Sequence, residues 1–173
     1  EATSDESGQQ IRLVAEFSRL LASYDPSMSE EDEDTLFHAA PMHDIGKIKI
    51  PTEILNKPGK LTEAEFTTVK HHTTLAYEMM SFSDRSLMKA SAIIALQHHE
   101  RWDGRGYPNQ LKGETIHPYA RIVALADVFD ALANRRHYKP AWPMEEVVTY
   151  INEQRSRQFE PKLVDIFNQH QDE

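Results

Sequence analysis

Histidine and aspartate side chains occur in this sequence at positions where apolar residues are expected. His43 and Asp44 follow Leu36 and Ala40 at the spacing of one face of a helix. A carboxylate on a buried face costs roughly several kcal/mol unless a cation or a full set of hydrogen bonds meets it. The sequence therefore predicts a partner for Asp44, either a cation or a set of hydrogen-bond donors.

Polar side chains of the same types lie on three other expected helices. Asp127 and Asp130 are one turn apart in the otherwise apolar segment IVALADVFDALA, His98 and His99 follow an apolar run, and His72 lies in a further helix. Imidazoles and carboxylates together are the ligands that Fe, Mn, Ni and Zn take in proteins. One buried His or Asp is usually a hydrogen-bonded core residue, but this many in one small domain favour a metal centre.

The chain has room for about seven helices, so we expect an all-α domain. Ser29 and the acids after it suit the start of a helix, and Thr62 to Glu65 form a capping box. Pro41 is expected to bend the chain just before the His-Asp pair. The expected helices are Gln9 to Tyr24, Ser29 to Asp44, Thr62 to about Met80, about Ser86 to His99, a fifth from Pro118, Pro143 to about Arg155, and a last one from Pro161.

The composition fits one domain with a sizeable core, because the chain has 173 residues. The net charge of -9 argues against binding of nucleic-acid polymers or anionic membranes. Cysteine is absent, which excludes disulfides and fits a cytoplasmic protein. No apolar stretch approaches the roughly 20 residues of a membrane span, and no signal peptide is visible. The chain begins with Glu1 rather than Met, as expected for a domain cut from a longer protein with a sensor or receiver region before it.

The sequence resembles the HD-GYP family, a bacterial branch of the HD-superfamily phosphohydrolases that cleaves cyclic di-GMP. The blocks that carry the resemblance are HDIGKIKIP, NKPGKLT, HHERWDGRGYP, LKGETI and ARIVALADVFDAL, which together span nearly the whole chain. The resemblance implies one HD-domain-like helical bundle over residues 1–173. A long loop in this bundle carries Gly106, Tyr107 and Pro108.

The resemblance also implies a centre of two divalent metal ions. Around one ion it places His43, Asp44 and Asp127, and around the other Asp44, His72, His98 and His99. Of the adjacent pair His71 and His72, the family register selects His72, and we expect His71 to be exposed. Fe and Mn are the first expectation for the metal, and Ni or Zn could occupy the same ligands.

Two departures from the family pattern bear on this expectation. Gln10 stands where the family has a histidine that binds a third metal, so we expect two ions, with Glu6 as a weaker ligand. Residues 156–160 replace the family's Gly-Thr-His-Phe-Asp and keep only Phe159 and an acid at Glu160. We expect little effect of this second departure on the chemistry.

The resemblance further implies a set of substrate contacts. A basic cluster at the end of the fifth helix and a lysine one turn after His43 would bind phosphate from two sides. The aromatic residue of the loop would stack on a guanine or hydrogen-bond a phosphate, and Asp130 would be a metal ligand, a substrate contact or a support for a ligand. The expected substrate contacts are Lys47, Tyr107, Asp130, Arg136 and Lys139.

We therefore expect a metal-dependent phosphodiesterase that hydrolyses cyclic di-GMP to pGpG, and to GMP if the dinucleotide binds again. Asp44 would bridge the ions, a metal-activated hydroxide would attack, and Lys47 and Arg136 would neutralise charge on the phosphoryl oxygens. No general acid is evident. One alternative is a different phosphohydrolase of the same superfamily that acts on another cyclic dinucleotide or on a nucleoside monophosphate. Another is a signalling module that binds cyclic di-GMP or a GGDEF-type partner domain with little turnover, and a homodimer also stays open.

Overall fold

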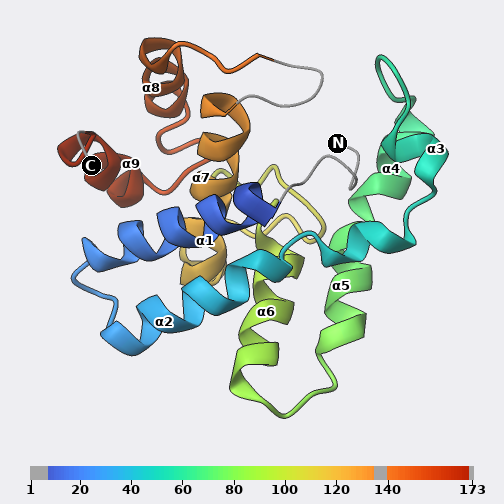
Figure 1. Cartoon of the computed structure of the whole chain (residues 1–173), viewed down its shortest axis with the longest axis horizontal. Helices are drawn as coiled ribbons and strands as arrows, with labels where there is room; N and C mark the ends of the chain where they lie inside the picture. Colours follow the sequence, from blue (N-terminus) through green and yellow to red (C-terminus); the bar gives the residue numbers. More distant parts are fainter. Residues whose placement is uncertain (1–7, 135–139, 172–173) are drawn as a thin grey trace.

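The computed structural model describes residues 8–134 and 140–171, and this part of the chain is helical without a strand (Figure 1). The expected all-α class is confirmed. The α-helices are α1 (Gly8–Ser23), α2 (Glu30–Ala39), α3 (Thr52–Leu55), α4 (Glu63–Lys70), α5 (His72–Met80), α6 (Ser86–Gln97), α7 (Pro118–Ala133), α8 (Met144–Glu153) and α9 (Pro161–Gln169). Three short 3-10 helices are η2 (Ala40–Met42), η3 (Ile45–Lys49) and η4 (Gly113–Thr115).

The structure divides two of the expected helices into shorter elements. The helix that begins after Ser29 ends at Ala39 and continues as η2, because Pro41 has no N–H to donate to the helix. The segment expected to run from Thr62 to Met80 is interrupted at His71, which separates α4 from α5. Both interruptions lie next to residues of the expected metal centre.

Capping boxes fix where α2 and α4 begin. The sequence predicted the box at Thr62 and predicted Ser29 as an N-cap. The Ser29 hydroxyl accepts from the Asp32 N–H at 3.1 Å, and the Asp32 carboxylate accepts from the Ser29 N–H at 2.9 Å. Thr62 and Glu65 repeat this arrangement at the start of α4, at 3.1 Å and 2.8 Å. Each box satisfies two N–H groups that a helix start leaves without partners.

The central helix of the bundle is α7, which packs against α1, α6 and α8 (Figure 1). Its residues from Ile122 to Ala126 are all buried, so the helix is surrounded on every side in this stretch. A large core joins α7 to α1, α2, α6, α8 and α9, and a smaller apolar cluster lies between α5 and α6. None of the described helices has the length and apolar character of a membrane span.

A close backbone contact joins η3 to α5. A Cβ atom at Gly46 would lie 1.9 Å from the carbonyl oxygen of His72 and 3.0 Å from the backbone nitrogen of Ala76. Because both neighbours are backbone atoms of a helix, neither can move aside. Gly46 therefore sets how closely the His43–Asp44 turn approaches His72.

Replacing Gly46 by alanine should destabilise the fold, because the added methyl group forces η3 away from α5. We expect Gly46→Ala to lower the free energy of unfolding by about 2 kcal/mol in urea denaturation. Gly8→Ala is the matched control, since a Cβ at Gly8 meets nothing within 4 Å. Equal stability of the two variants would contradict the proposed close contact.

Ser156 has a left-handed backbone conformation, with φ of 66°, at the position where the family pattern has glycine. This conformation is strained for a residue with a Cβ atom. Ser156→Gly should therefore raise the free energy of unfolding, by about 0.5 to 1 kcal/mol. Ser81→Gly is the control, because Ser81 has an ordinary φ of -69° and glycine there should lower stability. Destabilisation by both changes would show that Ser156 carries no strain.

Candidate metal centre

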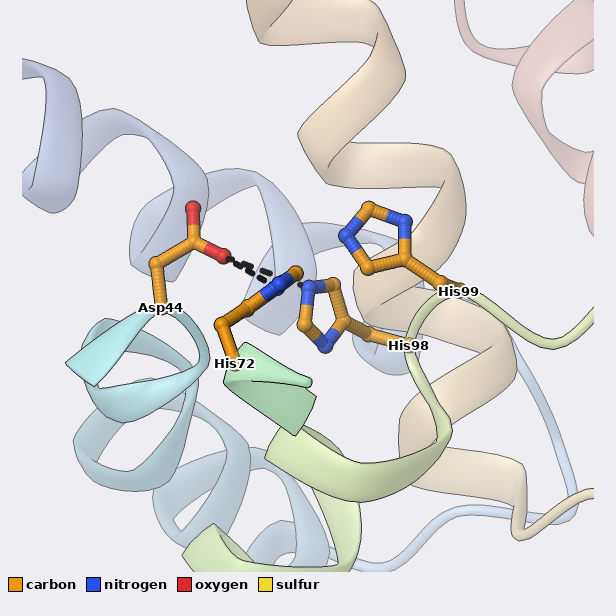
Figure 2. A group of neighbouring side chains, drawn as sticks. All are labelled: Asp44, His72, His98 and His99. Atoms are coloured by element: carbon orange, nitrogen blue, oxygen red, sulfur yellow. Dashed lines mark ion pairs between the residues drawn. The ribbon is translucent and has the colours of Figure 1, made fainter. Parts of the chain in front are cut away.

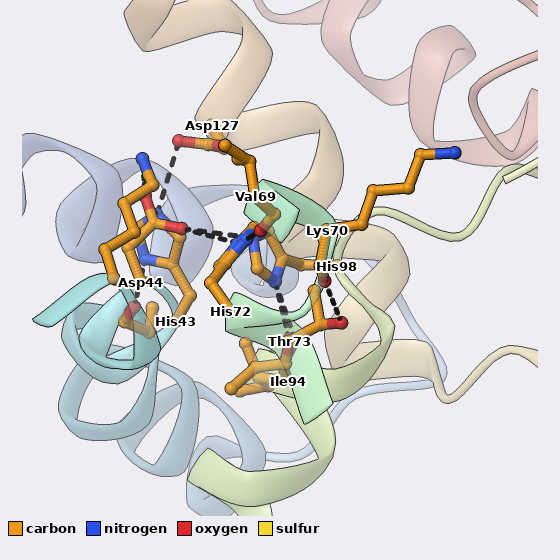
Figure 3. A network of polar contacts seen from close by, with 12 residues as sticks. His43, Asp44, Val69, Lys70, His72, Thr73, Ile94, His98 and Asp127 are labelled. Atoms are coloured by element: carbon orange, nitrogen blue, oxygen red, sulfur yellow. Dashed lines mark hydrogen bonds and ion pairs between the residues drawn. The ribbon is translucent and has the colours of Figure 1, made fainter. Parts of the chain in front are cut away.

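Six of the expected ligand residues converge on one site, although they come from separate elements (Figures 2 and 3). One pair lies in the turn between η2 and η3, one residue begins α5, one pair directly follows α6, and one residue lies in α7. In that order they are His43 and Asp44, His72, His98 and His99, and Asp127.

Asp44 lies at the centre of the cluster and faces two sides of it. Its Oδ1 atom is 3.3 Å from Nε2 of His72 and 3.4 Å from Nε2 of His98 (Figure 2). Its Oδ2 atom is 3.2 Å from Nε2 of His43 and 3.2 Å from Nζ of Lys47. A carboxylate placed in this way has one oxygen for each of two neighbouring cations.

The ligand atoms form two overlapping groups, and within each group they all lie within 4.8 Å of one another. The first group is Asp44, His72, His98 and His99, and the second is His43, His98 and Asp127. The resemblance assigned His98 to one ion, whereas the geometry places it within reach of both groups. Asp127 joins the second group through its Oδ1 atom, which is 3.3 Å from Nε2 of His43.

Three of the histidines are held by backbone carbonyls. Each places Nδ1 against the carbonyl oxygen three residues earlier, at 2.7 Å for His43, 2.7 Å for His72 and 3.0 Å for His98 (Figure 3). A carbonyl can only accept, so Nδ1 carries the proton and Nε2 of a neutral ring presents a lone pair to the site.

Whether these Nε2 atoms have hydrogen-bond partners tests how well the site suits a metal. Among the residues that the structure describes, Nε2 of His43, His72 and His98 is buried without a hydrogen-bond partner, and so is Oδ1 of Asp44. Leaving several such atoms unsatisfied in one place is costly. Divalent cations at the two ligand groups would satisfy all four, so the residues present fit a metal centre.

Burial and neighbouring charges raise the pKa of some residues of the cluster and lower the pKa of others. Burial lowers the pKa of His43, but the carboxylates of Asp44 and Asp127 outweigh burial and hold this pKa well above its ordinary value. Burial raises the pKa of Asp44, but the charges of His43 and Lys47 and the hydrogen bonds from His43 and His72 together outweigh burial and hold this pKa well below the usual range. Burial lowers the pKa of His98, and burial with the neighbouring imidazoles lowers that of His99 further. The rings of His98 and His99 are therefore neutral, as metal ligands must be.

Glu100 is a buried residue whose burial the sequence pattern does not predict. Its carboxylate accepts two backbone hydrogen bonds from the following loop, from Asn109 at 2.8 Å and from Leu111 at 2.9 Å. These bonds fold the loop back, and the ring of Tyr107 stacks on the ring of His99 with centroids 4.9 Å apart. Glu100 thus ties the loop to the metal site. An acid directly after two histidines was visible in the sequence, but its burial was not.

Gly106 is required for the same turn of the loop. A Cβ atom at this position would lie 2.5 Å from the carbonyl oxygen of His99 and 2.5 Å from the backbone nitrogen of Arg101. The glycine of the Gly-Tyr-Pro motif therefore lets the loop pass against the backbone that carries the histidines.

Some of the other expected site residues lie in the described part of the chain, and the rest lie outside it. Lys47 is buried beside Asp44, and His71 is exposed as expected. Asp130 is buried in α7, accepts from the Asn134 side chain at 2.9 Å, and lies outside both ligand groups. Gln10 lies in α1. The remaining expected residues, Glu6, Arg136 and Lys139, lie outside the described residues.

A cavity of about 300 Å³ lies beside the cluster. Its lining includes His99 and Asp127 of the cluster together with Phe66, Lys70 and Tyr107. Its volume is at the lower end of the range for small-molecule sites.

Comparison with known proteins identifies the family of this chain. The family model described as HD domain matches residues 3–163. The chain is 51% identical over 138 residues to the cyclic di-GMP phosphodiesterase response regulator RpfG of Xanthomonas campestris pv. campestris, covering 80% of this chain and 36% of that protein. It is 43% identical over 173 residues to the 3'3'-cGAMP-specific phosphodiesterase 2 of Vibrio cholerae, covering 100% of this chain and 33% of that protein.

The chain thus spans about a third of the length of these curated relatives. Two solved structures share its fold at low sequence identity. A cyclic GMP-AMP specific phosphodiesterase of V. cholerae, V-cGAP3, has a TM-score of 0.70 at 20% identity, with 99% of this chain and 45% of that chain covered. Bd1817 of Bdellovibrio bacteriovorus, described as an HDG"Y"P protein, has a TM-score of 0.73 at 18% identity, with 100% and 55% covered. The chain therefore belongs to the HD domain family, and its resemblance to the HD-GYP branch is confirmed.

Proposed function

We propose that this domain is a metal-dependent phosphodiesterase that hydrolyses cyclic di-GMP to pGpG, with GMP as the product of a second cleavage. The observation that carries the proposal is that three buried Nε2 atoms without a hydrogen-bond partner, those of His43, His72 and His98, converge on the buried carboxylate of Asp44. The name of the X. campestris relative supports cyclic di-GMP as the substrate.

The proposed cofactor is a pair of divalent transition-metal ions, held by the two ligand groups with Asp44 between them. The ligand set contains imidazole and carboxylate without thiolate, which suits Fe or Mn first and also accepts Ni or Zn. Ions in this place supply positive charge that activates a water and stabilises the transition state of phosphoryl transfer. Gln10 in place of a histidine supports two ions rather than three.

The residues of the chain itself would bind and orient the substrate. Lys47, held against Asp44, places a positive charge where the cleaved phosphate must lie. Burial, and then the charges of Asp44 and Asp127, raise the pKa of Tyr107, so its hydroxyl stays protonated and can donate to an anionic oxygen. Arg136 and Lys139 stay proposed phosphate contacts on the basis of the family resemblance.

A second candidate substrate is 3'3'-cGAMP. The V. cholerae relative that matches the whole chain is named for this substrate, and the two cyclic dinucleotides share the same phosphodiester ring. Turnover of both compounds by the metal-loaded domain would separate the two activities. The binding-module alternative is not favoured. A GGDEF-type or other regulatory partner, a homodimer, an upstream sensor region and a cytoplasmic location stay predictions.

Asp44→Ala should remove metal and hydrolysis together, because it takes away the carboxylate that faces both ligand groups. We expect elemental analysis of anaerobically purified variant to show less than about a tenth of the wild-type metal, as for loss of a ligand worth 10-fold or more in affinity. Chromatography should show no pGpG from cyclic di-GMP.

Asp84→Ala is the matched control, since Asp84 is an exposed carboxylate in the turn between α5 and α6. It should keep full metal content and full turnover. Hydrolysis that persists in Asp44→Ala at the wild-type rate would refute the proposed mechanism.

Glu100→Gln should weaken substrate binding without loss of metal. An amide keeps one acceptor oxygen but turns an N–H₂ group toward the second backbone donor, so one of the two hydrogen bonds to the loop is lost. We expect KM to rise about tenfold, as for one charge-assisted hydrogen bond, while metal content stays unchanged. Glu114→Gln, an exposed change in the same loop, should alter neither quantity. An unchanged KM in Glu100→Gln would show that the loop needs no such anchor.

A further inference from the structure

A positive side chain lines the cavity on the side away from Asp44. The ammonium group of Lys70 lies 4.9 Å from the ring centroid of Phe66 and 5.2 Å from that of Tyr107. Cation-π contacts of this length hold a lysine in place without neutralising its charge. Within the described part of the chain, Lys70 forms no ion pair with a carboxylate, so its charge is available to a ligand.

The position of Lys70 is fixed relative to the metal cluster. Lys70 is the last residue of α4, and its backbone carbonyl accepts from the Thr73 hydroxyl at 2.9 Å. Tyr107, which it contacts, stacks on His99 at 4.9 Å. Lys70 is therefore separated from a proposed metal ligand by one aromatic ring.

The side chain of Lys70 extends away from Asp44 and Asp127, as Figure 3 shows. Its charge thus lies outside the cluster, whereas Lys47 lies within it, 3.2 Å from Asp44. Of the other cations that line the cavity, Arg101 is paired with Asp103 at 3.1 Å, and Arg105 is exposed on the loop. Lys70 is thus the partly buried lining cation that has no carboxylate partner among the described residues.

A cyclic dinucleotide carries two phosphates, and only one can lie at the metal centre during cleavage. The second phosphate keeps its negative charge and must lie at a distance from the ions. We propose that Lys70 binds this second phosphate, which is not cleaved, and so selects substrates that contain two phosphates. The proposal rests on the proposed function, and it holds equally for cyclic di-GMP and 3'3'-cGAMP.

Lys70→Gln tests the proposal with two substrates of the metal-loaded domain. For cyclic di-GMP, we expect KM to rise about tenfold with kcat nearly unchanged, as for loss of a charged hydrogen bond made equally in the ground and transition states. For bis(p-nitrophenyl) phosphate, a diester with a single phosphate, kcat/KM should stay within twofold of wild type. Lys70→Arg keeps the charge and should recover most of the affinity for cyclic di-GMP.

Lys89→Gln is the matched control, because Lys89 is exposed on α6 and its loss removes the same charge. It should leave both substrates unaffected. An unchanged KM for cyclic di-GMP in Lys70→Gln would overturn the proposal. An equal loss with both substrates would also overturn it, since this would indicate a structural role for Lys70.

A different set of results is expected if the domain is not a phosphodiesterase. Wild-type protein that retains metal but cleaves no cyclic dinucleotide would refute the phosphodiesterase activity. The affinity for cyclic di-GMP, measured by calorimetry, then tests Lys70 directly. Weaker binding by Lys70→Gln than by Lys89→Gln would support the phosphate site, and equal binding would overturn it.

Discussion

The structure depends on what balances the negative charge of the buried Asp44 carboxylate. Removing a charge from water costs several kcal/mol, roughly, and neutral imidazoles that present lone pairs cannot repay this cost. In the protein without a cation, His43 does so in part, because the facing carboxylates favour its protonated form. Divalent cations at the two ligand groups can replace that proton and also satisfy the Nε2 atoms of His72 and His98. The same cluster that is unfavourable without a cation becomes a set of ligands with one.

The candidate ligands reach one point because most of them lie at interruptions of helices. His72 begins α5, His98 follows the last residue of α6, and the His43–Asp44 pair lies between two short 3-10 helices. Adjacent residues within a helix point about 100° apart, so a pair in mid-helix could not both face one site. At a helix end the chain can turn, and the rings of His98 and His99 lie with centroids 4.0 Å apart. The loop anchored by Glu100 then covers this end and brings Tyr107 over the site.

The sequence was informative about types of residue and about helix starts, but not about contacts between distant segments. The spacing of Asp44 from Leu36, and the capping residue Thr62, were enough to predict buried polar groups and a helix boundary. The break at His71 was missed because the residues around it suit a continuous helix. The role of Glu100 was missed because nothing in the local pattern distinguishes a buried acid that binds a loop from an exposed one. These features depend on tertiary packing, which apolar periodicity does not encode.

The central claim is that the His and Asp cluster binds a pair of cations on the two sides of Asp44. Crystals of the anaerobically purified protein, measured by anomalous diffraction above and below the Fe and Mn absorption edges, test this claim directly. The account predicts two anomalous peaks, one among the group that contains His72 and His99 and one among the group that contains His43 and Asp127. Well-ordered His and Asp side chains without any anomalous peak among them would contradict the account. Metal bound only elsewhere on the protein would also contradict it.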